Sequence, residues 1–569
     1  MKKYLVIVSI AAATLLNSCI KETYPQSSTI TAEQAANAPG AYQNFVDAIT
    51  SSLCGSFFYG GNDNTYVYDF GYPSFYIQWD IMGNDIVYSG SGSEHYTTWY
   101  TCGPALGPGY AICQLPWTYY YSWIKNCNVV IAAANGNADY EHRSGSGIAY
   151  AMRAMFYMDL ARMYAQKNYA ADPDAETVPI VTESTTTTEA NNNPRATNTK
   201  IWGFIIDDLN QAESLLTAKI ADDGSVEIPG YSRADKYTPD STVVYGLKAR
   251  AYLEMEDWAN AKKYAKLAQN GYSIMTQEQY LSKTDGFNKP NDSWMFGCTY
   301  KSDDKNIQLN DADSCWGSQM IIEVSASECG YSANYTGPKR IDAHLFSTIP
   351  ATDFRRLCWV DPALDDLASQ ADKLAALAAY TDDPAGVYKT GISKSTGQFK
   401  RLGWMPVKFR PKDGEHADQY KAFTVAVPIM RVEEMYLIEA EAAGMLNAAE
   451  GQALLESFAK TRDASYVYGQ HQEGYNSTYA TPLQNEVWWQ RRVELWGEGH
   501  ATFDIKRLNK GIIRSYAGTN HWSQYLWNTN EVPNWMTLCF VGTEANYNVA
   551  LNQNPTPVRP EEDSPAHVF

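Results

Sequence analysis

Residues 244–272 read VYGLKARAYLEMEDWANAKKYAKLAQNGY, and this stretch decides the fold. Tyr252 and the alanines Ala261, Ala265 and Ala268 fall at the offsets where two antiparallel helices need an aromatic and small residues, and Glu256-Asp257 suits the turn between them. Small side chains let paired helices approach closely, as in a tetratricopeptide unit, and such a unit buries its apolar face only against its neighbours. The stretch therefore predicts a helical hairpin that packs on others of its kind.

Further helical hairpins are indicated on both sides of this one. Apolar residues recur every three or four positions in 152–164 and again in 202–216, which predicts two amphipathic helices. The Thr-, Asn- and Pro-rich stretch 177–200 between them reads as an exposed connection. Residues 430–446 and 451–465 form another helical pair, so we expect four hairpin-like units, dispersed along the chain rather than in tandem.

Two long stretches lack a sustained helical period. Residues 54–125 are crowded with Tyr, Trp, Gly and Asn, and 282–425 are irregular apart from the Ala-rich segment 365–380. Compact domains seldom contain such stretches unless they serve a function. We therefore predict a mostly α fold, in which a platform of tetratricopeptide-like hairpins presents long aromatic-rich loops. The expected single domain spans 31–569, with a helical scaffold at about 31–53, 126–281 and 426–515 and loop-rich binding regions at about 54–125 and 282–425.

The N-terminal residues have the layout of an export signal. Lys2 and Lys3 precede an apolar stretch, residues 4–16, that is too short for a membrane span. The sequence Leu-Asn-Ser-Cys ending at Cys19 resembles a lipobox, which predicts a signal peptide at 1–18, lipidation of Cys19 and a tether at 19–30. Asn17 is not the most usual residue at its position, so cleavage by ordinary signal peptidase is the alternative. In the lipobox interpretation, acyl chains on Cys19 attach the protein to a membrane.

Net charge and missing motifs exclude several classes of function. The 569 residues include 64 acidic and 45 basic side chains, and a net charge of −19 disfavours a protein that binds nucleic-acid phosphates. The chain contains no C-x-x-C, no phosphate-binding G-x-x-x-x-G-K, no G-x-G-x-x-G and no H-x-x-x-H. The acid-rich residues 302–314 depart from the EF-hand spacing, so we interpret them as a solvated loop rather than a calcium site. We expect no cofactor, and a structural calcium ion at this loop is the alternative.

Charged residues near the C-terminus suggest structure rather than catalysis. Glu494 and Glu498 would share one helix face and are flanked by Arg491 and Arg492. Acidic and basic side chains that alternate in this way are typical of an ion-pair network. We therefore interpret the two glutamates as members of such a network rather than as a catalytic acid–base pair.

Four longer motifs resemble those of one family, and they occur in the family's order. They are AMRAMFYMDLARMYA (151–165) followed by ETVPIVTE, IWGFIIDDLNQAESLL (201–216), VAVPIMRVEEMYLIEAEA (425–442) and QRRVELWGEGHATFDIKRLNKG (490–511). Together with the lipobox, they resemble the SusD/RagB family of Bacteroidota outer-membrane lipoproteins. Gln490 and Ala501 depart from the pattern, where an acid and an arginine are usual, which puts local ion pairing in doubt.

The resemblance implies a function as well as a fold. Proteins of this family face outward from the outer membrane, hold a lipid anchor and sit as a lid over a SusC-like TonB-dependent transporter. They capture oligo- or polysaccharide for import and are not enzymes, so we expect polysaccharide utilisation and nutrient uptake here, with a glycan and the transporter as partners.

Candidate ligand contacts come from the two stretches with the right mixture of side chains. Neutral sugars present apolar faces and a fringe of hydroxyls, so a site needs flat aromatic rings beside Asp, Asn, Gln or Arg. Residues 78–100 and 293–318 supply both. The predicted contacts are Trp79, Asp80, Asn84, Asp85, Trp99, Tyr100, Tyr300 and Trp316.

Two other functions stay open at this point. A lipid-anchored glycoside hydrolase would need two acids about 5–9.5 Å apart in an open cleft. A tetratricopeptide-type scaffold would bind a protein or peptide in its concave face.

Overall fold

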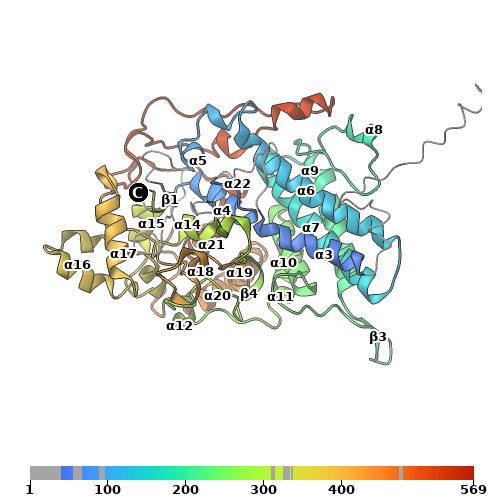
Figure 1. Ribbon diagram of the computed structural model, residues 1–569, viewed down its shortest axis with the longest axis horizontal. Helices are drawn as coiled ribbons and strands as arrows, with labels where there is room; N and C mark the ends of the chain where they lie inside the picture. Colours follow the sequence, from blue (N-terminus) through green and yellow to red (C-terminus); the bar gives the residue numbers. More distant parts are fainter. Residues whose placement is uncertain are drawn as a thin grey trace, which may run out of the picture.

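The computed structural model describes residues 40–55, 67–88, 96–308, 314–323, 334, 337–472 and 479–569. The predicted signal peptide (1–18), Cys19 and the tether (19–30) lie outside these ranges, as do residues 309–313 of the acid-rich loop. Figure 1 shows a scaffold of long helices at one end of the molecule and short helices joined by irregular segments at the other. In the described part of the chain, no helix has both the length and the apolar run that a membrane crossing requires.

The stretch that decides the fold forms the expected hairpin. Helix α10 (Ser241–Glu254) and helix α11 (Trp258–Ala268) pack on each other. The turn follows from two residues: Glu256 has a left-handed backbone, and the Asp257 carboxylate accepts a hydrogen bond from Asn260 N–H at 3.2 Å. Ala261, Ala265 and Ala268 are fully buried, as close helix packing requires. The prediction for this stretch is confirmed.

The other scaffold helices stack on this hairpin in succession. Helix α7 packs between α6 and α9, α9 contacts α10, and α11 contacts α19, which pairs with α20. At the α19–α20 contact, a Cβ on Gly451 would lie 2.2 Å from the Cα of Gly444, so this close approach requires glycine. The remaining bounds of this scaffold are α3 (Ala41–Ser51), α6 (Ala111–Ala134), α7 (Tyr140–Tyr164), α9 (Asn198–Leu216), α19 (Val432–Leu446) and α20 (Ala448–Ala459).

The described chain contains three small antiparallel sheets, two of which join segments that are distant in the sequence. Strand β1 (Ile86–Val87) pairs with β5 (Arg340–Ile341), and β4 (Trp294–Thr299) pairs with β6 (Ala426–Arg431), which leads directly into α19. Strands β2 (Lys219–Ile220) and β3 (Val226–Ile228) form a separate hairpin. The first two sheets therefore join segments that lie more than 100 residues apart in the sequence.

Short helices occupy much of the regions expected to be irregular. Helix α4 (Tyr72–Ile81) lies within 54–125 and has all ten residues buried, so it has no polar face and gives no helical period. Helix α6 also begins inside that range, and the region is more helical than the sequence predicted. The others in these regions are α5 (Thr97–Thr101), α13 (Lys305–Gln308), α14 (Trp316–Met320), α15 (Ala343–Thr348), α16 (Gln370–Leu377), α17 (Pro384–Tyr388) and α18 (Gln419–Ala422). The expected scaffold ranges also contain α8 (Thr187–Ala190), α12 (Gln277–Tyr280), α21 (Pro482–Glu494) and α22 (Ala501–Arg507).

The C-terminal motif forms a buried ion-pair network. Glu494 contacts the guanidinium groups of Arg355, Arg431 and Arg462 at 3.2, 3.2 and 3.0 Å, and Glu498 contacts Lys408 at 2.6 Å. Burial alone raises a carboxyl pKa, but the three guanidinium groups hold the pKa of Glu494 well below its usual range. These partners come from distant segments rather than from neighbouring helix turns. The structural interpretation of these acids is therefore supported, and the motif binds the scaffold to the irregular end.

Candidate functional site

All eight predicted ligand contacts lie in the interior. Their exposed fractions run from 0 to 5%, for Trp79, Asp80, Asn84, Asp85, Trp99, Tyr100, Tyr300 and Trp316. None of them presents a ring face or a carboxylate to the surface in this structure. Aromatic residues with a polar edge can serve a core as well as a sugar platform, and here they serve the core.

The polar members of this set hold the C-terminal motif. The carboxylate of Asp80 accepts hydrogen bonds from the backbone N–H groups of Gly499 and Ala501 at 3.0 and 2.9 Å, where α22 begins. Asp85 forms an ion pair with Arg492 at 2.6 Å, and the Asn84 amide oxygen accepts from Ile513 N–H at 2.9 Å. Burial raises the pKa of Asp80 to about 7. These side chains therefore connect α4 and β1 to the C-terminal region.

The aromatic members all belong to one hydrophobic core inside the protein. Trp316 on α14 meets Tyr76 on α4 edge to face, with ring centroids 6.1 Å apart. The Tyr300 hydroxyl donates to Phe70 O at 2.7 Å, and the Tyr100 hydroxyl lies 2.8 Å from His521 Nδ1. The stretches 78–100 and 293–318 thus share one core. That any of the eight contacts a glycan stays a prediction, and the structure favours other residues for the surface site.

A cavity of about 480 Å³, which we call the aromatic groove, is lined by aromatic rings, of which Phe569 is exposed and His344 and Trp404 are half-buried. It lies between α15, the turn at Trp404, residues 516–518 and the chain end at 567–569. The rings of His344 and Phe569 stack with centroids 3.3 Å apart, and Tyr516 meets Phe569 at 5.3 Å. The rings that line the groove are those of His344, Phe346, Trp404, Tyr516, His567 and Phe569.

Trp404 has the most unusual conformation in the groove. Its backbone φ is +66°, in the left-handed region that bulky residues rarely adopt. Two hydrogen bonds hold it there: Trp404 N–H donates to Val360 O at 2.7 Å, and Trp404 O accepts from Ile341 N–H at 3.1 Å. Such a conformation costs of order 1–3 kcal/mol and tends to occur at functional sites. The ring is half-buried, and the Arg401 guanidinium lies 5.2 Å from its centroid.

The opposite wall of the groove is held by a polar cluster. The Tyr516 hydroxyl donates to the Asp342 carboxylate and accepts from His344 N–H at 3.1 Å. Asp342 also accepts from Leu345 N–H at 2.8 Å, which caps the start of α15. The rings of His344 and Tyr516 are therefore positioned by the fold before any ligand arrives, which reduces the entropy that binding must overcome.

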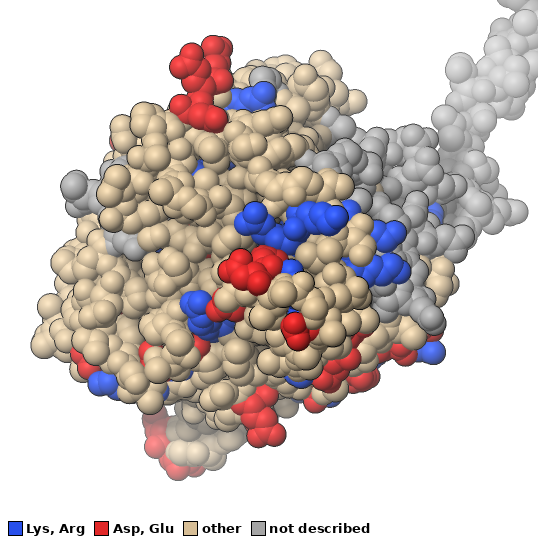
Figure 2. Space-filling model, turned by 90° about the vertical axis from the view of Figure 1, so that its left-hand side faces the viewer, with Lys and Arg blue, Asp and Glu red and all other residues tan. Residues whose placement is uncertain are grey.

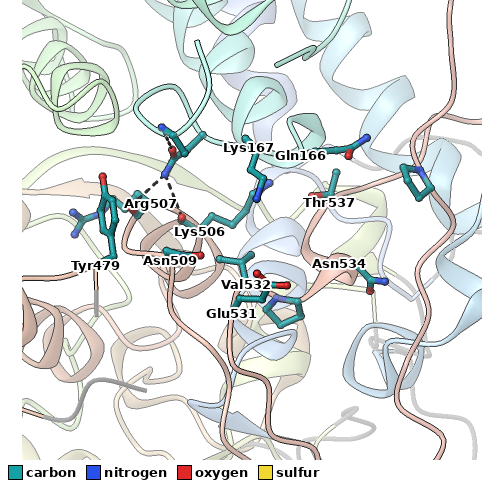
Figure 3. Close-up of a pocket in the computed structure, with 14 residues that line it drawn as sticks. Gln166, Lys167, Tyr479, Lys506, Arg507, Asn509, Glu531, Val532, Asn534 and Thr537 are labelled. Carbon is teal, nitrogen blue, oxygen red and sulfur yellow. Dashed lines mark hydrogen bonds between the residues drawn. The ribbon is translucent and has the colours of Figure 1, made fainter. Parts of the chain in front are cut away.

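A second cavity, of about 310 Å³, is polar and has a different character (Figure 3). Gln166, Asn534 and Thr537 lie on one side of it and Tyr479 on the other, so amide and hydroxyl groups line it beside a single aromatic ring. Lys506 at its base donates to Ala165 O at 2.9 Å, and burial lowers the pKa of this lysine to about 7. This amide pocket can form hydrogen bonds but gives a sugar only one face to stack on.

The residues that line the groove can also be examined for catalytic carboxyl groups and metal ligands. Among the described residues that line it there is no Asp or Glu, whereas glycosidases use a pair of carboxyl groups. In the ranges that the structure describes, no group of three His, Cys, Asp or Glu side chains is placed to hold a metal ion. The groove is therefore suited to binding a ring-shaped ligand by stacking.

Only a weak signal in the sequence points to these groove residues. Trp404 stands in RLGWMP (401–406), inside the range 282–425 predicted to hold binding loops, but no spacing distinguishes it from other tryptophans. Its strained backbone depends on Val360 and Ile341, which lie far from it in the sequence. His344, Tyr516 and Phe569 come together only in the folded chain.

Comparison with known proteins gives two family matches. A model described as the SusD family matches residues 257–556, which is more than half of the chain. A second model, described as starch-binding associating with outer membrane, matches residues 85–253. No curated protein sequence matches the chain.

Solved structures share the fold over nearly the whole chain. A SusD-like carbohydrate binding protein from Bacteroides vulgatus ATCC 8482 is 23% identical, with a TM-score of 0.67 over 90% of this chain and 97% of the other. A laminarin binding SusD-like protein is 17% identical, with a TM-score of 0.57 over 90% and 98%. Surface glycan-binding protein A from Bacteroides thetaiotaomicron, solved in complex with laminarihexaose, is 16% identical, with a TM-score of 0.61 over 90% and 98%.

Proposed function

Because the chain belongs to the SusD family, we propose that it is a cell-surface protein that captures an oligo- or polysaccharide in the aromatic groove and delivers it for import. The family resemblance and the mostly helical fold predicted from the sequence are both confirmed. The proposal assigns the first contact with the glycan to the rings around Trp404 rather than to the buried rings near α4.

The observation that supports this assignment is the half-exposed ring of Trp404 in a strained, doubly hydrogen-bonded turn. A sugar ring stacks on an exposed indole through its apolar C–H face, and neighbouring polar groups meet its hydroxyls. A cavity of about 480 Å³ is within the range of small-ligand sites and leaves a chain free to continue beyond it. Modest affinity at one site is sufficient when a polymer offers many repeats.

We also propose a cellular location and a partner protein. Lipidation of Cys19 would anchor the mature protein to the outer membrane, and a SusC-like TonB-dependent transporter would receive the glycan. Both follow from the lipobox and the family. The laminarin binding of one structural neighbour, and the laminarihexaose bound to another, support a glycan as the ligand class. The carbohydrate-binding proteins among the structural neighbours support binding without hydrolysis.

Affinity electrophoresis on a panel of polysaccharides tests this function. The wild-type protein should be retarded by at least one polymer, without release of reducing ends, and Trp404→Ala should reduce that retardation at least tenfold. Tyr110→Ala is the matched control, because Tyr110 is 55% exposed and lies outside the groove. Equal retardation of wild type and Trp404→Ala would place the site elsewhere, and steady release of reducing ends would indicate an enzyme.

A further inference from the structure

Basic side chains occur in the segment that leads into the aromatic groove at Trp404. Lys389, Lys394 and Lys400 are exposed, and Arg401 is half-buried against Trp404. We call residues 389–401 the basic segment; it follows α17 directly. Figure 2 views the end of the molecule at which α16 and α17 lie, and it shows Lys and Arg side chains gathered in a patch on that face. The net charge of the whole protein is −19, so a patch of basic side chains differs in sign from the protein as a whole.

A buried arginine lies beneath this segment. Arg340 on β5 is 1% exposed, and its Nη2 donates to Phe399 O at 2.9 Å and Arg401 O at 3.1 Å. Its Nε and Nη1 have no hydrogen-bond partner in the described part of the chain, and no carboxylate there forms an ion pair with it. Burial, followed by the neighbouring charge of Arg401, lowers the pKa of Arg340 to about 9.

Comparison with the other fully buried arginines shows how unusual this is. Arg355 and Arg431 form ion pairs with carboxylates. Arg514 has no such pair, but each of its three nitrogens donates to a backbone carbonyl. In Arg340, by contrast, Nε and Nη1 have neither a carboxylate nor a carbonyl partner among the described residues. An uncompensated buried charge costs several kcal/mol, so an anion close to Arg340 would recover part of that cost.

The acids near the segment leave part of these guanidinium groups without partners. The Asp365 carboxylate accepts hydrogen bonds from Leu402 N–H at 2.6 Å and Gly403 N–H at 3.1 Å, and its charge acts on Arg340 without a direct ion pair. Asp361 forms an ion pair with Arg356 at 3.0 Å. Arg401 has a buried Nε without a hydrogen-bond partner among the described residues. Guanidinium nitrogens of both Arg340 and Arg401 are therefore left without a described partner beside the groove.

We propose that the glycan bound in the aromatic groove is acidic, and that its carboxylate or sulfate ester groups bind Arg401 and the lysines of the basic segment. Arg340 contributes from beneath through its uncompensated charge. This inference rests on the proposed function and adds the chemical class of the ligand. The protein as a whole repels a polyanion, so the attraction is local and falls steeply with added salt.

Matched polymer pairs separate charge from sugar identity. The probes are polygalacturonate with its methyl-esterified form, and dextran sulfate with dextran, each titrated at low and at physiological salt. We expect the charged member of at least one pair to bind at least tenfold more tightly than its neutral form. Preference within the first pair identifies a carboxylate ligand, and preference within the second identifies a sulfate ester.

Two variants test the residues. Arg401→Gln should lose about tenfold in affinity for the charged polymer, whereas Lys219→Gln, on the exposed β2 strand, should not change it. Arg340→Met should also weaken binding of the charged polymer while raising Tm, because it removes an uncompensated buried charge. A lower Tm for Arg340→Met would assign that residue a structural role and overturn its part in the proposal.

The other outcomes distinguish this proposal from the proposed function. If neutral and charged polymers bind equally and Trp404→Ala abolishes both, the ligand is not acidic and the glycan-binding function stands. If the probes and a broad neutral glycan panel all fail to bind, both proposals fail. Binding to phosphatidylglycerol vesicles, without binding to any charged polymer, would show that the basic segment meets a membrane and would overturn the inference.

Discussion

The core around α4 and the aromatic groove both consist largely of aromatic side chains. They differ in how deeply the rings are buried and in the conformation of the backbone that holds them. Around α4, Trp79, Trp99, Tyr100 and Trp316 are buried against other rings, and their polar neighbours bind the C-terminal motif. In the groove, Trp404 is half-exposed on a turn that two hydrogen bonds hold in a left-handed conformation. Aromatic content alone therefore does not identify a binding surface, and our proposed site rests on exposure combined with backbone strain.

The largest effect expected from this difference concerns stability. Trp79→Ala should lower the free energy of unfolding by about 3–5 kcal/mol, because it leaves a cavity beside Phe503 in a closely packed core. Trp404→Ala should cost only about 1 kcal/mol, since the ring is half-buried and leaves no closed cavity. Denaturant unfolding of the two variants measures both values. Equal losses would show that Trp404 is a core residue like Trp79.

A pH-dependent effect of intermediate size is expected at Asp80. Burial raises its pKa from 3.8 to about 7, so the folded state binds the proton more tightly than the unfolded state does. The contribution of this group to stability is therefore greatest below pH 4 and declines, by on the order of 2–4 kcal/mol, as pH rises from 4 to 7.

Asp80→Asn removes this titration and provides its test. The difference in unfolding free energy between Asp80→Asn and wild type should shift in favour of the variant as pH rises from 4 to 7. A difference that stays constant over this interval would mean that the two backbone N–H groups at the start of α22 keep Asp80 ionised throughout.

The smallest expected effect isolates the strain at Trp404. Trp404→Gly should be more stable than Trp404→Ala by about 1 kcal/mol, because alanine retains the Cβ that disfavours a left-handed backbone and glycine does not. Both variants should lose glycan binding equally, since neither has a ring. If alanine is the more stable replacement, the turn is not strained.

How much the sequence could predict differs between these regions for physical reasons. The α10–α11 hairpin followed from Ala261, Ala265 and Ala268, because small residues at these offsets are a local signal of close helix packing. The ion-pair role of Glu494 and Glu498 was also predictable from their flanking arginines. Their actual partners Arg355, Arg431 and Lys408 come from distant segments and were not.

The ligand contacts could not be assigned in the same way. Helix α4 is buried on every side, so its sequence lacks the alternation that separates an inner from an outer face. Tyr and Trp in such a segment fit a core and a sugar platform equally well. The position of Trp404 depends on hydrogen bonds to Val360 and Ile341 and on the return of the chain end to His344, none of which is encoded locally.

Hydrogen–deuterium exchange with and without the tightest-binding polysaccharide tests the central claim most directly, because it locates the ligand on the chain. We predict that the glycan slows exchange at residues 343–347 and 401–406, which border the aromatic groove, and leaves residues 97–101 unchanged. Protection confined to 97–101, with none at the turn around Trp404, would contradict the assignment and return the site to the residues near α4.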